Sequence, residues 1–178
     1  FQEDLIDALC ARAVSEGWLT VEDTQKFAST DRRELQDAID ESNIHGWLQG
    51  RIHDGEGRYA ALVTTLLQED ANRLQTLKDV AFYTGKEKRT EVPTTAPEAF
   101  HQLDNTLLNG MPCDQVMKVT ESNPDKVVWE ETQDLHSSFW NGQGAYYYDL
   151  RAELIKGILA DSGLTFKQTD TNRYEIIK

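Results

Sequence analysis

The chain has 178 residues, 39% of them hydrophobic, with four Trp, six Tyr and six Phe. This apolar content is enough for a packed core and excludes a chain that is disordered throughout. The net charge of −13 would repel a polyanion, so we expect no nucleic acid partner. No run of about 18 apolar residues occurs, so we expect no membrane span.

The two cysteines, Cys10 and Cys113, lie far apart and do not have the spacing of a metal site or a redox pair. The four histidines also lack such a spacing, so the sequence predicts neither a metal nor another cofactor. Widely separated cysteines and the lack of a signal-like segment favour a cytoplasmic location.

The first third of the chain has the pattern of short helices. Apolar residues at helical spacing predict a helix over residues 2–16, which Gly17 ends. Thr20 with Asp23 is close to a capping box, and Asp31 with Glu34 repeats that spacing before a second short helix. Both short helices have strongly acidic outer faces.

Residues 46–57 contain four glycines in twelve positions. Glycine at this density predicts a loop or a hairpin that turns at Asp54–Gly55. The segment lacks the alternating oxygen ligands of a calcium loop, and it lacks the Lys-Ser/Thr pair of a phosphate loop. We therefore expect a plain turn.

Residues 58–83 form the longest periodic run, with apolar residues at helical spacing throughout. The pattern predicts one helix of about 39 Å, taking 1.5 Å per residue. A helix of this length favours two alternatives, which are packing across its own domain and a homodimer formed through residues 58–83.

Residues 85–97 are polar, include two prolines and predict a linker. Pro97 is expected at the first position of the next helix, whose apolar stripe is Phe100, Leu103 and Leu107. The linker divides the chain into a helical layer, residues 1–97, and an α+β closing unit, residues 98–178. We expect the two parts to form one compact domain.

The closing unit alternates between strand and helix patterns. Strands are predicted at residues 115–120 and 126–132, around the turn Asn123-Pro124-Asp125. A helix follows over residues 146–160, which Gly163 ends, and two short strands at 164–167 and 173–177 complete the unit. The predicted fold class is α+β, with an N-terminal helical layer packed on a small, mostly antiparallel C-terminal sheet that carries one long helix.

Residues 132–148 are the densest group of candidate functional side chains. Asp134 and His136 are a candidate catalytic carboxylate–imidazole pair, because two residues separated by one position share a face of an extended strand. The ring-bearing candidates for a ligand pocket are Trp129, Phe139, Trp140, Tyr146, Tyr147 and Tyr148, and Arg151 is the candidate cation. The alternative is that the aromatic residues belong to the core and His136 lies exposed in a loop.

Two parts of the closing unit resemble known groups of bacterial domains. Residues 119–140 are similar to the central hairpin of L-2-amino-thiazoline-4-carboxylic acid hydrolase-like proteins. The helix over 150–163 and the strands after it are similar to the end of 4-vinyl reductase-type small-molecule-binding domains. These resemblances rest on layout, and the cysteines expected from them are absent, with His136 and Tyr174 in their neighbourhood. They imply a small-molecule pocket between helix and sheet, and a hydrolase-like activity.

Two functional hypotheses follow. The first is a small-molecule-binding domain with a pocket between helix and sheet, which could act as an enzyme on a small polar or aromatic metabolite. The second is a non-catalytic acidic protein, of the inhibitor, immunity or adaptor type, that binds a basic protein. It is suggested by the net charge and by the acidic run Asp31, Glu34, Asp37, Asp40 and Glu41.

Overall fold

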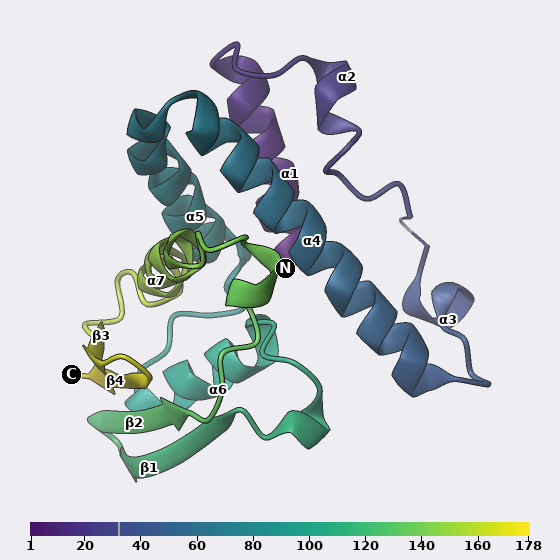
Figure 1. Ribbon diagram of the computed structural model, residues 1–178. Coiled ribbons are helices and arrows are strands. Elements are labelled where there is room, and N and C mark those ends of the chain that lie inside the picture. Colours follow the sequence, from purple (N-terminus) through teal and green to yellow (C-terminus); the bar gives the residue numbers. More distant parts are fainter. Residues whose placement is uncertain (32) are drawn as a thin grey trace.

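The computed structural model describes residues 1–31 and 33–178, and most of its helices come before a small sheet in the chain (Figure 1). The α-helices are α1 (Gln2–Ser15), α2 (Val21–Thr24), α3 (Leu35–Ala38), α4 (Ile44–Glu69), α5 (Leu74–Lys88), α6 (Ala96–Thr106) and α7 (Ala145–Ile158). The short 3-10 helices are η1 (Ala71–Arg73), η2 (Pro112–Asp114) and η3 (Ser137–Phe139). The strands are β1 (Met117–Asn123), β2 (Lys126–Glu131), β3 (Thr165–Asp170) and β4 (Arg173–Ile177). The predicted α+β class is confirmed.

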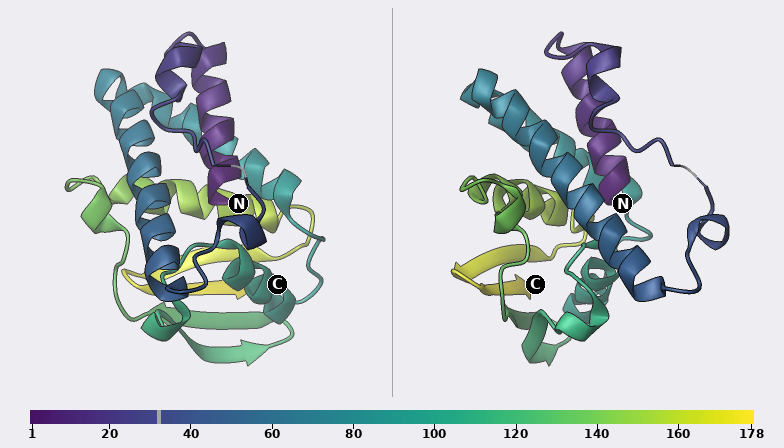
Figure 2. Two further views of the ribbon diagram at one scale, coloured as in Figure 1. Left: turned by 90° about the vertical axis from the view of Figure 1, so that its right-hand side faces the viewer. Right: turned by 45° about the vertical axis from the view of Figure 1, so that its right-hand side comes forward.

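The four strands form one antiparallel sheet in the order β1-β2-β4-β3, so β1 and β3 are its edges. Side chains alternate between the two faces of a strand. One face carries Trp129, Phe166 and Tyr174 and packs against α6 and α7, which lie on the same side of the sheet (Figure 2). The opposite face is mostly polar, with an ion pair of 3.2 Å between Arg173 Nη1 and Glu130 Oε1, although Val128 on this face is also buried. The helices therefore cover only one face of the sheet.

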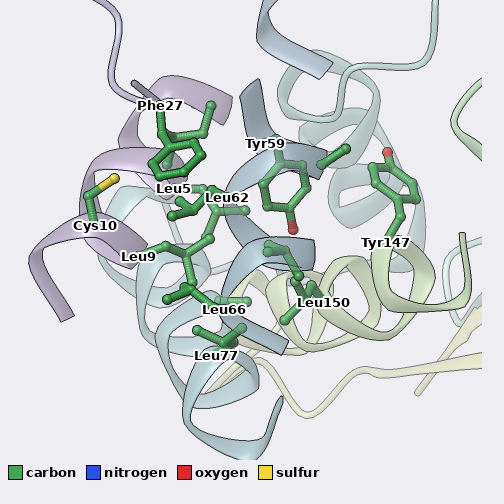
Figure 3. Close-up of a cluster of buried hydrophobic side chains, with 14 of the residues drawn as sticks. Leu5, Leu9, Cys10, Phe27, Tyr59, Leu62, Leu66, Leu77, Tyr147 and Leu150 are labelled. Carbon is green, nitrogen blue, oxygen red and sulfur yellow. The ribbon is translucent and has the colours of Figure 1, made fainter. Parts of the chain in front are cut away.

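Two clusters of buried apolar side chains hold the fold together. The first lies among α1, α4, α5 and one side of α7, whose side chains converge in Figure 3. The second lies between the sheet, α6 and the other side of α7. Since α7 contributes Leu150 and Leu154 to the first cluster and Ile155 and Ile158 to the second, it links the helical layer to the sheet. The predicted units 1–97 and 98–178 remain a prediction.

The prediction of a turn at residues 46–57 is wrong, because these residues are helical and belong to α4. Burial of the second half of the helix stabilises it, with Tyr59, Leu62 and Leu66 all in the first cluster. A helix can carry glycines when tertiary packing outweighs their cost of about 1 kcal/mol each. Asn43 caps the start of α4, its side chain accepting a hydrogen bond from the backbone N–H of Gly46.

The single helix predicted over residues 58–83 is also wrong. The chain leaves the helical conformation at Asp70, whose side chain accepts a hydrogen bond from the N–H of Asn72 and starts η1. The apolar residues on both sides of this break are buried within the chain's own core. A second subunit is therefore not needed to cover them, and the homodimer remains a prediction.

The predicted linker is shorter than expected, because α5 continues to Lys88. Thr95 and Glu98 form a capping box at the start of α6, which places Pro97 at the second helical position instead of the first. The capping box at Thr20 and Asp23 is confirmed, whereas the one expected at Asp31 and Glu34 is wrong.

Candidate functional site

Two adjoining hollows between α7 and the β3–β4 hairpin form what we call the helix–sheet cleft. They have volumes of about 360 and 490 Å³ and share Tyr148, Gln168 and Tyr174. The first hollow is also lined by Arg151, Ala152, Lys156, Phe166, Lys167 and Thr169. The second is also lined by Glu131, Thr132, Gln133, Asp134, Thr171 and Asn172. Their combined volume suits a small organic molecule.

A buried ion pair lies at the base of the cleft. The Nη2 group of Arg151 donates to Oε1 of Glu131, and both side chains are about 95% buried (5% exposed). Burial lowers the pKa of Arg151. The acidic groups around it, mainly Tyr147 and Glu131, have a larger opposite effect, so the pKa of Arg151 is raised. The Nε and Nη1 atoms find no partner within the described part of the chain. Arg151 is therefore a buried, incompletely paired cation beside the cleft.

Two tyrosines separate the hollows. The ring of Tyr174 lies 5.4 Å from the guanidinium carbon of Arg151, and burial raises the pKa of its hydroxyl to about 12. Burial and a hydrogen bond of 2.8 Å to Asp134 also raise the pKa of Tyr148. Both hydroxyls are therefore protonated at neutral pH. That of Tyr148 already donates to Asp134, so towards a ligand it can act as an acceptor.

Asp134 lies at the far end of the second hollow and does not bond the ring of His136, so the predicted Asp134–His136 pair is not formed. Its Oδ1 atom accepts bonds from the backbone N–H groups of His136 and Ser137 and from the hydroxyl of Tyr148. Burial raises the pKa of Asp134, but these hydrogen bonds outweigh it and hold the pKa at about 2. The expected face-sharing geometry requires an extended strand, whereas residues 137–139 turn into η3.

His136 pairs instead with Glu56 of α4, and we call the hollow beside them the His136 pocket. The Nδ1 atom lies 3.1 Å from Oε1 of Glu56, and the imidazole stacks on Tyr147 with ring centres 3.9 Å apart. Glu56 is 1% exposed and its Oε2 has no partner within the described residues. The pocket, of about 190 Å³, is lined mainly by Gln49, Ile52, His53, Leu108, Met111, Asp114, Leu135 and Phe139. His136 is thus buried and oriented, not exposed in a loop.

The predicted ligand-binding aromatics lie mainly in the core. Trp129 packs among Phe100, Phe166 and Tyr174 in the second cluster. Trp140 and Tyr147 are buried in the first cluster, and Tyr146 packs against it. Phe139 lines the His136 pocket, and of the predicted ligand residues Tyr148 and Arg151 line the helix–sheet cleft.

Several residues of these sites were not among the predicted ones, namely Glu56, Tyr174, Lys156 and Lys167. Glu56 had a usable signal, because it precedes Tyr59, Ala60 and Val63 on one helical stripe that is otherwise apolar. A carboxylate on an apolar stripe points to a buried partner. The lysines had no signal of this kind.

The described residues contain no cluster of three or more His, Cys, Asp or Glu side chains that could hold a metal ion. No helix in residues 1–31 and 33–178 is long and apolar enough to cross a membrane. Cys10 is buried and Cys113 exposed, and neither forms a disulfide.

Comparisons with protein-family models, curated proteins and solved structures found no match. The resemblance to the two groups of bacterial domains therefore remains a prediction.

Proposed function

We propose that this chain binds a small molecule carrying an anionic group in the helix–sheet cleft. The observation that carries the proposal is the charge of the first hollow, whose only charged lining residues are Arg151, Lys156 and Lys167. Arg151 pairs with Glu131 and Lys156 with Glu153, so Lys167 is the lining cation that forms no ion pair within the described residues. The tyrosine hydroxyls beside them supply the directed hydrogen bonds that fix a ligand's orientation.

The apolar side of such a ligand has its own contacts. Phe166 and Ala152 line the first hollow together with the rings of Tyr148 and Tyr174. An aromatic or aliphatic body can therefore pack against apolar surface while its anionic group lies near the lysines. This combination supports a small metabolite as the ligand and gives no support to a polyanion.

Native mass spectrometry on protein purified gently from its own host tests the proposal first, because the measured mass of a retained molecule indicates what that molecule is. NMR titration of the labelled chain with a panel of small carboxylic acids then locates the site. We expect shifts on α7 and β3. Gln168→Trp, which fills the region shared by both hollows, should abolish them. Thr165→Trp, on the same strand but outside the cleft lining, is the matched control.

Absence of a retained molecule together with absence of shifts in the cleft would contradict the proposal. That result would favour the acidic interaction protein. Val21 and Leu35, which are 68% and 63% exposed, would then mark the surface to examine, because Leu35 lies within the acidic run and Val21 precedes it.

A second candidate function is acid–base catalysis in the His136 pocket. Its support is the hydrogen bond between Glu56 and His136, since a carboxylate on one imidazole nitrogen orients the ring and leaves the other nitrogen for proton transfer. A screen of small esters and amides tests it, with His136→Gln as the variant. Loss of turnover with retained thermal stability would support catalysis, and equal turnover in both proteins would contradict it.

A further inference from the structure

The helix–sheet cleft has opposite charges at its two ends. The cations of the first hollow are Arg151, Lys156 and Lys167, and the carboxylates of the second are Glu131 and Asp134. Because Arg151 and Glu131 pair with each other, the charges left to meet a ligand are those of the two lysines and of Asp134. Asp134 is ionised at neutral pH because the hydrogen bonds that it accepts hold its pKa at about 2, against the effect of burial. A ligand that lies along the whole cleft meets a cationic end and an anionic end, which suits a zwitterion.

The backbone spacing along α7 favours a ligand longer than one amino acid. Tyr148, which bonds Asp134, and Lys156 are eight positions apart on α7, or about 12 Å at 1.5 Å per residue. An extended chain spans about 3.3–3.6 Å per residue, so about three residues bridge this distance. The spacing therefore favours a short peptide, whose charges lie at its two termini.

The position of β3 supports an extended conformation for that peptide. Four consecutive residues of β3, from Phe166 to Thr169, line the first hollow. Phe166 and Lys167 are successive residues and point to opposite faces of the strand, so a hollow that both of them line reaches the strand's edge. The strand β3 pairs with β4 alone, so its outer backbone groups have no strand partner in the described sheet. An extended peptide can add to such an edge through backbone hydrogen bonds.

We propose that the helix–sheet cleft binds a peptide of about three residues, extended along the outer edge of β3. Its carboxylate lies beside Lys156 and Lys167, and its amino group lies beside Asp134. Lys156 also donates to Glu153, outside the cleft lining, so Lys167 is the main carboxylate partner. The inference rests on the proposed function, because it specifies the class of small molecule that the same cleft binds.

NMR titration of the ¹⁵N-labelled full chain tests the inference with the tripeptide Ala-Phe-Ala. Its N-acetylated form, its C-terminal amide and free phenylalanine are the comparison ligands. We expect the free tripeptide to bind most tightly and to shift backbone amides of β3 but not those of the other edge strand, β1. Each cap removes one terminal charge and should weaken binding about tenfold.

Lys167→Gln should weaken binding of the free tripeptide about tenfold and leave binding of its amide unchanged. Lys118→Gln, on the edge strand β1, is the matched control and should change neither. Asp134→Asn should weaken binding of the free tripeptide but not of its N-acetylated form.

Each contrary result has a definite meaning. Equal binding of the acetylated and free tripeptides overturns the amino-end assignment and leaves a carboxylate site, such as one for the C-terminus of a protein. Equal binding of phenylalanine overturns the peptide assignment. If the peptides give no shifts while the carboxylic acids above shift the cleft, only this inference fails. If both panels are without effect, the proposed function fails too.

Discussion

The crossing of α5 and α7 and the amino-terminal half of α4 are both helical and both carry glycine, yet the glycines have different surroundings. At the crossing, a Cβ on Gly157 would overlap the carbonyl oxygen of Phe82, and one on Gly85 would overlap that of Leu154. In α4, a Cβ on Gly50 or Gly57 would meet no atom within 4 Å. Glycine is required where two helix backbones touch, but in α4 nothing in the described structure requires it.

Adding a methyl group at the crossing should give the largest effect. Gly157→Ala forces α5 and α7 apart, and both helices carry the first cluster. We expect a loss of more than about 2 kcal/mol in the free energy of unfolding, since overpacking outweighs the gain in helix propensity. Urea denaturation followed by circular dichroism measures it. An unchanged midpoint would show that the helices do not approach this closely.

The pair of Glu56 and His136 connects α4 to α7, because His136 stacks on Tyr147. His136→Ala removes the ring and leaves the buried carboxylate without this partner, so we expect a loss of about 2 kcal/mol. The matched control is His45→Ala, at an exposed position of α4, which should change stability by less than about 0.5 kcal/mol. Equal losses in both variants would contradict a specific role for the pair.

A methyl group added to α4 should raise the free energy of unfolding, whereas one added at the crossing should lower it. Gly50→Ala adds a helix-favouring side chain where space is open, so we expect a gain of about 0.5–1 kcal/mol. The same denaturation experiment measures it. A loss of stability would show that something covers this face of α4 in solution.

The smallest effect concerns Asp134, on the segment that joins the sheet to α7. Its pKa of about 2 lies below the usual value of about 3.9, so its stabilising contribution is present above that value and declines as the pH falls towards 2. Asp134→Asn should therefore lose less stability than the wild type between pH 5 and pH 2. After allowance for screening of this exposed carboxylate, the difference should be about 1 kcal/mol or less. The same loss of stability in the wild type and in Asp134→Asn between pH 5 and pH 2 would contradict this prediction.

The sequence predicted the closing unit well because its signals are local. Alternation along β2 and the helical stripe of α7 each need only a few neighbouring residues. The four glycines of residues 46–57 predicted a turn where the chain forms α4, because the effect of glycine depends on what packs around the helix. The break at Asp70 was missed because apolar spacing continues on both sides of it.

The candidate sites were less predictable because their residues come together only in the fold. His136 and Glu56 are 80 positions apart, and no pattern within 132–148 indicates the partner. The aromatic residues were predicted as ligand contacts, but large rings favour the core over a cleft, as Trp129 and Trp140 show. Arg151 was named as a candidate cation, whereas nothing in the sequence distinguishes Lys167 from the other lysines of the chain.

The central position of β4 has a consequence for folding. β1–β2 and β3–β4 are each hairpins of neighbouring residues, but β2 must find β4 across residues 132–172. Local hairpins form quickly, whereas joining distant strands requires closure of a long loop. Because α7 lies within that loop and packs on both clusters, its docking brings the hairpins together. We therefore expect the two cores to appear in one kinetic phase, whose rate is set by the docking of α7.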